Sequence, residues 1–189
     1  CGGTLSGTTY TTGPATANCT VTATFAIKTF TISASAGTNG AIAPSGAVSV
    51  NYGAARAFTI TPGAGYHVAD VLVDGSSVGA VASYSFTNVL AGHSISATFA
   101  VNTYTVTPSA GANGTISPSV PQTVNQNATT SFTVTPNSGY AIASVTGCGG
   151  TLSGTTYTTG PATASCTVTA SFTASASNTL TVNRSGSGS

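Results

Sequence analysis

Apolar residues alternate with serine and threonine along most of this chain. In residues 30–34, FTISA, the apolar residues Phe30, Ile32 and Ala34 are separated by threonine and serine, and residues 58–61 repeat the pattern. A period of two places the apolar side chains on one face of a β-strand and the hydroxyl groups on the other. No window shows the 3.6-residue period of a helix. The pattern predicts an all-β protein built from half-buried strands.

Glycine and proline interrupt the alternation at short intervals. Asn39-Gly40 and Asp74-Gly75 are favoured two-residue hairpin turns, because both residue types adopt a positive φ at low cost. The spacing of these turns predicts five to six short strands in each repeated unit. The apolar positions predict a core for residues 29–101 that consists of Phe30, Ile32, Ile42, Val50, Phe58, Ile60, Tyr66, Val68, Val71, Phe86, Ile95 and Phe99.

The sequence repeats itself at two offsets. Residues 1–25 and 148–172 differ at two positions only, at an offset of 148 − 1 = 147. FTISASAGTNGAIAPS from Phe30 matches YTVTPSAGANGTISPS from Tyr104, at an offset of 104 − 30 = 74. The repeated unit is therefore about 74 residues long.

This period divides the chain into four segments. Residues 1–28 form the C-terminal half of a module, 29–101 a complete module without cysteine, 102–173 a complete module with two cysteines, and 174–189 the start of a further module. We therefore expect the chain to be part of a longer array. The connections AIKT and AVNT are too short for free tumbling, which predicts a semi-rigid rod.

The chain carries few charges, with three Lys or Arg and two Asp or Glu residues. Such a chain lacks the clustered positive charge that nucleic-acid binding and membrane-surface binding require. No apolar run reaches the roughly 20 residues of a membrane helix, so we expect no membrane insertion in this segment. A nearly uncharged surface has weak self-repulsion, which favours association with other copies of itself.

Four cysteines occur as two pairs at the same spacing, Cys1 with Cys19 and Cys148 with Cys166. A zinc site is the alternative, but it would need closer cysteine pairs or added histidine. We therefore predict one disulfide in each pair, worth on the order of 3 kcal/mol in the chain-entropy model. Disulfides place the protein in an oxidising compartment, outside the cytosol.

The offsets place Asp74 and His93 where the other module has its cysteines, since 148 − 74 = 74 and 166 − 73 = 93. We predict that Asp74 and His93 replace the disulfide with an ion pair or hydrogen bond. The alternative is that the one-residue gap lies elsewhere and the two residues never meet. A metal site formed by these two residues with His67 and Asp70 lacks the closely spaced oxygen ligands of a hard-cation site, so we expect none.

GSSVG at residues 75–79 matches the G-x-S-x-G pattern of a serine nucleophile at Ser77. That motif needs a strand before it and a helix after it. Here a strand-like segment follows, so we interpret residues 75–79 as a hairpin. We expect no catalytic residues, no cofactor and no enzymatic activity in this chain.

The segments TITPGAGYHVADVLVDG and TVTPNSGYAIASVTG, followed by SISATF and TVTASF, resemble the divergent InlB B-repeat family of bacterial surface modules. The resemblance covers nearly the whole chain. It implies small β-grasp-like or sandwich-like modules in tandem on large secreted or surface-anchored bacterial proteins. Such repeats usually form stalks, spacers or adhesive segments, and the resemblance implies no catalytic residues.

Three functions are consistent with these observations. The first is a structural stalk or extracellular fibre whose main partner is itself, with residues Thr179, Leu180, Thr181 and Val182 as a strand between modules or subunits. The second is an adhesin module for glycan or a surface protein, for which Tyr10, Tyr52, Tyr84 and Tyr157 are the candidate contacts. The third is an accessory repeat of a secreted enzyme. All three place the chain outside the cell or at its surface.

Overall fold

The computed structural model describes residues 1–176 and residue 186, and the regular secondary structure of these residues consists of β-strands. Residues 1–28 contribute β1 (Gly3–Ser6) and β2 (Thr9–Thr12). The strands of the first complete module are β3 (Thr29–Ala36), β4 (Gly40–Ala43), β5 (Gly46–Asn51), β6 (Arg56–Pro62), β7 (Tyr66–Val73), β8 (Ser76–Ser77), β9 (Ser83–Phe86) and β10 (His93–Val101). The strands of the second are β11 (Thr103–Ala110), β12 (Gly114–Ser117), β13 (Gln122–Asn125), β14 (Ser131–Pro136), β15 (Tyr140–Thr146), β16 (Thr151–Ser153), β17 (Thr156–Thr158) and β18 (Cys166–Ala174).

Each complete module consists of two sheets with a core between them. In the first module the sheets have the strand orders β5-β3-β10-β7-β8 and β4-β6-β9. The alternating pattern builds this arrangement, because the apolar face of each strand turns toward the facing sheet. The buried side chains of this core are Ile32, Ala34, Ile42, Val48, Val50, Phe58, Ile60, Val71, Phe86, Val89, Ile95 and Ala97.

The second module repeats this architecture with the strand orders β13-β11-β18-β15 and β12-β14-β17-β16. One difference lies at Pro108, which occupies the position of Ala34. Ala34 pairs with Gly46 of β5, whereas the pairing of β11 with β13 ends at Val106 and Gln122. Proline has no N–H to donate, so it ends this ladder two residues earlier.

The first and last long strands of each module lie next to each other in the same sheet and run parallel. Strand β10 pairs with β3 from His93 opposite Ile32 to Ala97 opposite Ala36. Strand β18 pairs with β11 in the same register. All other strand pairs in the described residues are antiparallel.

The glycine of each Asn-Gly turn also supports an aromatic ring. A Cβ atom at Gly40 would overlap the ring of Phe99, and one at Gly114 would overlap the ring of Phe172. The glycine at this position therefore allows the ring of the last strand to lie against the backbone of the short strand that follows the turn.

Residues 1–28 form the hairpin β1-β2, and no strand lies between residues 13 and 28. The counterpart of residues 19–27 in the second module is β18, which pairs with β11 and β15. Residues 1–28 contain no equivalents of these two strands, so residues 19–27 make no ladder. Phe25 is consequently 95 % exposed, whereas its counterpart Phe172 packs against the core.

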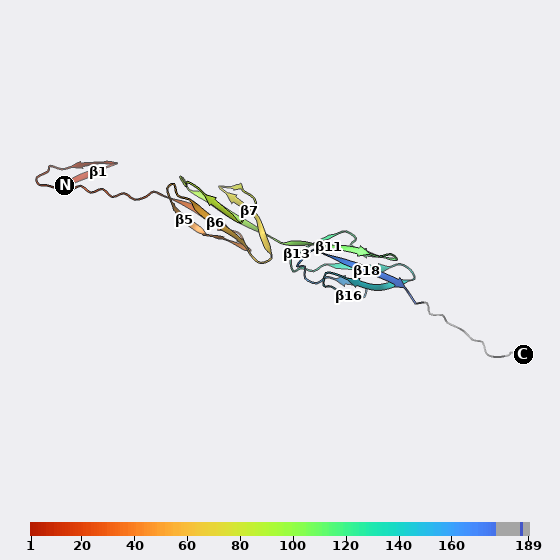
Figure 1. The fold of residues 1–189 in the computed structure, drawn as a ribbon. Helices are drawn as coiled ribbons and strands as arrows, with labels where there is room; N and C mark the ends of the chain where they lie inside the picture. Colours follow the sequence, from red (N-terminus) through yellow and green to blue (C-terminus); the bar gives the residue numbers. More distant parts are fainter. Residues whose placement is uncertain (177–185, 187–189) are drawn as a thin grey trace.

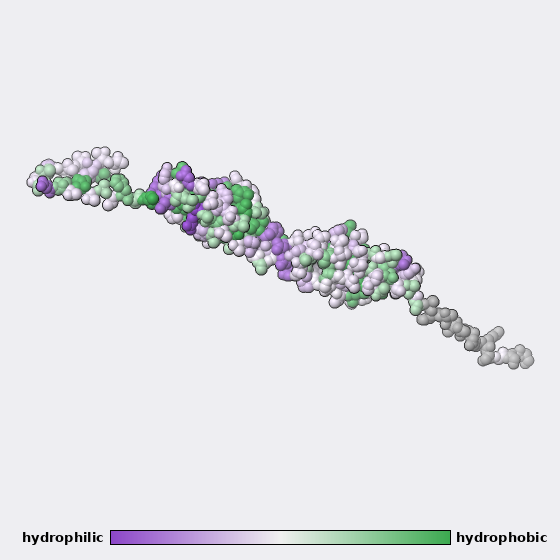
Figure 2. All heavy atoms as spheres, in the orientation of Figure 1, coloured by the Kyte–Doolittle hydropathy of each residue, from purple (hydrophilic) through white to green (hydrophobic). Residues whose placement is uncertain are grey.

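Figure 1 shows the two modules one after the other along the chain, and the chain enters and leaves each module at opposite ends. Their surfaces are mostly pale in Figure 2, as expected for serine, threonine and glycine, with few strongly hydrophilic positions. The described residues contain no helix, and thus no helix long and apolar enough to cross a membrane.

Candidate functional site

The end of β7 and the start of β10 meet at Asp74 and His93. The Nδ1 atom of His93 donates a hydrogen bond of 2.7 Å to Oδ2 of Asp74. The backbone N–H of Ser94 donates to Oδ1 of the same carboxylate at 2.8 Å. The ring of His93 lies beside that of Phe86, with centroids 4.9 Å apart. The structure thus brings together the two residues that the repeat alignment pairs.

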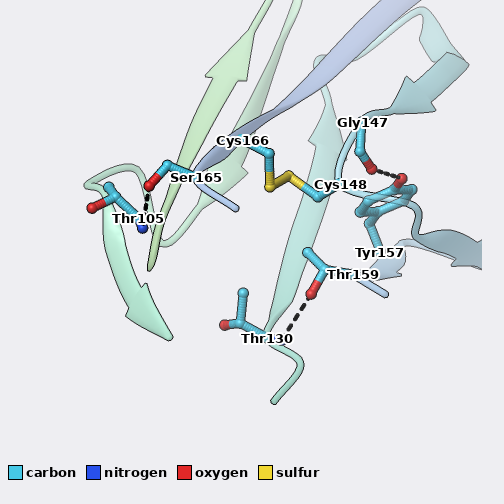
Figure 3. Close-up of a disulfide and its surroundings, with 8 residues drawn as sticks. All are labelled: Thr105, Thr130, Gly147, Cys148, Tyr157, Thr159, Ser165 and Cys166. Atoms are coloured by element: carbon cyan, nitrogen blue, oxygen red, sulfur yellow. Dashed lines mark hydrogen bonds between the residues drawn. A yellow bond between two sulfur atoms is a disulfide. The ribbon is translucent and has the colours of Figure 1, made fainter. Parts of the chain in front are cut away.

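The same place in the second module holds the Cys148–Cys166 disulfide, with Cα atoms 5.5 Å apart. Figure 3 shows this bond between the strand that begins at Cys166 and the turn that contains Cys148. Hydrogen bonds surround it: the Ser165 hydroxyl accepts from the N–H of Thr105, and the Tyr157 hydroxyl donates to the carbonyl of Gly147. We call this place, in either module, the cross-link position.

The two modules share a backbone conformation at the cross-link position. Asp74 has a φ of 50° and Cys148 a φ of 49°, and the glycine that follows each has a positive φ as well. Aspartate is among the few non-glycine residues that adopt this left-handed conformation readily. The turn holds aspartate in one module and cysteine in the other, and in both the partner residue begins the strand that lies beside it in the sheet.

The carboxylate of Asp74 is held in its charged form. The backbone hydrogen bond from Ser94 is the main cause that lowers the pKa of Asp74 below its ordinary value of 3.8, and the hydrogen bond from His93 lowers it further. Both donors favour the ionised carboxylate over the protonated one. The contact therefore exists at neutral pH as a charge-assisted hydrogen bond.

The remaining cysteines, Cys1 and Cys19, also form a disulfide. The hydroxyl of Tyr10 donates to the carbonyl of Cys1 at 2.7 Å, so it ties the second strand of the hairpin to the cross-link. Leu5, Tyr10 and Val21 line a hollow beside this hairpin. In the second module the counterpart of residues 19–27 is β18, which is paired with β11 on one side and β15 on the other.

The other polar residues singled out in the sequence lie apart from the cross-link position. Asp70 accepts a hydrogen bond of 2.6 Å from the hydroxyl of Ser77, and His67 bonds to Asn102. Ser77 lies in the two-residue strand β8, in a hairpin with β7, and no helix follows it. Within the described part of the chain, no group of three His, Cys, Asp or Glu side chains could hold a metal ion.

Asn102 connects the two modules through both its backbone and its side chain. Its N–H donates to the carbonyl of Gly65 in the first module, and its carbonyl accepts from the N–H of Gln126 in the second, each at 2.8 Å. The side-chain oxygen of Asn102 accepts from His67 at 3.0 Å, and its amide donates to the side chain of Gln126 at 3.1 Å. We call these four residues the junction.

The backbone part of the junction recurs at the neighbouring connections. The carbonyl of Lys28 accepts from Tyr52, and the N–H of Ser175 donates to Gly139, each at 2.8 Å. Lys28 and Ser175 correspond to Asn102 in the repeat. The short connections in the sequence predicted restricted motion between modules. No motif identified Gly65, His67 or Gln126 as contacts, because these residues are distant from Asn102 in the sequence.

The four tyrosines considered for ligand binding do not share one environment. Tyr157 is buried, and Tyr84 packs on the core beside Phe86. Tyr10 is partly exposed, and Tyr52 is 55 % exposed next to the ring of Phe30. Tyr52 occupies the position of Gln126, which in the second module faces the preceding module.

The proposed strand between modules, Thr179, Leu180, Thr181 and Val182, lies outside the described residues, as does most of segment 174–189.

The fold and the cross-link position define a class of protein, a chain of tandem all-β modules that each carry an internal cross-link or side-chain contact at the same position. The family model of the divergent InlB B-repeat domain matches residues 30–103 and again residues 104–176. The chain belongs to this family. No curated protein and no solved structure matches it significantly.

Proposed function

We propose that this chain is a structural segment of a secreted or cell-surface bacterial protein, in which the modules form a stalk. The observation that supports this most is the junction, where one residue, Asn102, is hydrogen-bonded to both modules. A connection that is hydrogen-bonded to the modules on both sides resists bending. Several such connections in series keep the two ends of the array apart. Repetition then sets the length.

Three further features support a stalk outside the cell. The disulfides suit an oxidising compartment. The surface of hydroxyl and amide groups carries little charge, so it offers little attraction for charged ligands or membranes. The family is one of repeat domains, and we assign the chain no catalytic role. Its partners in this proposal are its own neighbouring repeats and other copies of the chain.

An adhesive role is the second candidate, and it depends on exposed aromatic rings. Tyr52 and Phe30 form such a cluster, and the Lys28 ammonium lies 4.9 Å from the Phe30 ring. In the second module the equivalent face is the one that contacts Gly65 and His67 of the preceding module. The cluster is therefore explained by module docking, and we rank adhesion below the structural role.

The stalk is tested on bacterial cells that display the chain through a fused cell-wall anchor, with an epitope at the outer end. Residues 29–173 are present in one, two or three copies. A strand of nine residues is about 30 Å long, so each added copy of two modules should raise the epitope by roughly 60 Å. An epitope height that does not change with copy number would contradict the proposal.

A further inference from the structure

The strand order of each module fixes how the module responds to a pull on its two ends. The chain enters the first module through β3 and leaves it through β10, and these strands are paired side by side in parallel. In a parallel pair, the start of one strand and the end of the other lie at opposite ends of the ladder. Figure 1 shows this for both modules, with entry and exit at opposite ends.

A pull along the chain therefore loads this ladder in shear. All the hydrogen bonds of the ladder carry the force together and must break together, whereas a pull at one end opens them one by one. We propose that β3–β10 and β11–β18 are mechanical clamps, which make each module a load-bearing unit under tension. The biological use of the clamp rests on the proposed stalk function, whereas its resistance to shear follows from the strand order alone.

The clamp is protected on both of its edges and on its inner face. It is central in its sheet, with β5 on one side and β7 on the other. Its inward side chains Ile32, Ala34 and Ile95 are at most 5 % exposed. Water that could replace the ladder hydrogen bonds is thus kept from the inner face, and rupture of the clamp exposes core side chains at the same moment.

The cross-link position lies beside the clamp and does not bridge it. The Cys148–Cys166 bond joins β18 to the end of β15, so it leaves β11 free to slide past β18. The disulfide instead keeps an 18-residue loop closed after the clamp has broken. At up to 3.6 Å per residue this loop hides roughly 6 nm of chain. The Asp74–His93 contact is not covalent, so unfolding of the first module releases its whole chain length.

The ladder also shows which backbone groups belong to the clamp. Gly37 donates to the carbonyl of Ala97. Because N–H groups of a strand point alternately to its two neighbours, Ser35 also donates toward β10, whereas Ala34 donates toward β5. The second module has Pro108 at the position of Ala34 and Gly111 donating to Ala170 in place of Gly37 and Ala97. The clamp bonds are therefore retained where the proline is present.

The test is to stretch the 189-residue chain between handles at its two ends in an optical trap. We expect two unfolding events, of which one releases roughly 6 nm less chain than the other. With a reductant the two events should release nearly equal lengths. If the reductant opened the Cys148–Cys166 disulfide but changed neither released length, the assignment of this cross-link outside the clamp would be overturned.

The decisive comparison changes only the pulling direction. Handles attached by click chemistry at Lys28 and Ala91 lie at the same end of the first module's clamp and peel it open. We expect this geometry to unfold the module at a severalfold lower force than handles at Lys28 and Asn102, which load it in shear. Equal forces in the two geometries would refute the clamp, whatever role the chain has on the cell.

A matched pair of proline variants locates the clamp bonds. Ser35→Pro removes one of roughly six ladder bonds and should lower the shear force by about a sixth or more. Ala34→Pro copies the second module and should leave that force nearly unchanged. An equal loss in both variants would overturn the assignment, and if Ser35→Pro does not fold, the comparison of pulling directions still decides. The stalk function is judged separately, by the epitope height on cells.

Discussion

Removal of the Cys148–Cys166 disulfide tests whether the second module depends on its cross-link. The double variant Cys148→Ala with Cys166→Ala frees a loop with a sequence separation of 18. The chain-entropy model gives a loss of about 3 kcal/mol for a loop of this length. A module of this size has a urea dependence of roughly 1 kcal/mol per molar, so its unfolding midpoint should fall by about 3 M.

Hydrogen exchange with mass spectrometry, measured across urea concentrations, reports the two modules separately through their own peptides. The first module is an internal control, because it should keep its midpoint in the double variant. Replacement by the pair found in the first module, Cys148→Asp with Cys166→His, should recover less than about 1 kcal/mol, as expected for an exposed ion pair. A midpoint shift below about 0.5 M in the alanine variant would show that the second module does not depend on its disulfide.

Three further predictions concern the cross-link position, the glycine that supports an aromatic ring, and the junction. Because the pKa of Asp74 is lowered in the folded state, its contribution to stability is present above about pH 4 and is lost as the pH falls through the folded pKa. Amide NMR signals should show that the first module loses stability as the pH falls, and that this loss is absent in Asp74→Asn. The same dependence on pH in the original chain and in the variant would contradict the prediction. Gly40→Ala should lower the melting temperature of the first module, by an amount equivalent to roughly 1–3 kcal/mol, because the new methyl group meets the Phe99 ring. The second substitution Phe99→Leu should reduce that penalty, and an equal penalty in both backgrounds would show that the ring is not the cause. Asn102→Ala removes both side-chain bonds of the junction, so spin labels in the two modules should give a broader distance distribution, and an unchanged distribution would count against its role.

The repeat and the strand pattern were readable from the sequence because both depend on local order. Alternation assigned the buried faces, and most predicted core residues lie in the observed core or pack against it. Val48 was missed although it alternates with Val50 across Ser49, and Val89 was missed because it lies in a loop outside the alternating segments. Tyr66 was predicted in the core but is only half-buried at the end of its strand.

The limit of local information is clearest where the sequence is nearly duplicated. Residues 166–174 form a strand and residues 19–27 do not, although the first seven positions of the two segments differ only at Ser171 and Thr24. A strand in a sheet is stabilised by its neighbours, and β18 has two of them.

The candidate site was predictable in part for the same reason. Repeat alignment placed Asp74 and His93 at the positions of two cysteines, and the structure places them in contact. Alignment within one chain works here because cysteine is a distinct residue type, and its counterpart in the other module can be found from the repeat length. The junction has no such marker, since Gly65 and Gln126 act through turn geometry. The clamp follows from strand order, which alternation does not encode.

We infer that the junction makes the modules a semi-rigid rod. Small-angle X-ray scattering of arrays that carry two, four and six modules tests it directly through their maximum dimension. A rod predicts a linear increase of about 30 Å for each module, from the length of its longest strand. A dimension that grows only with about the square root of module number, as for flexibly linked beads, would show that the junction does not hold the modules in line.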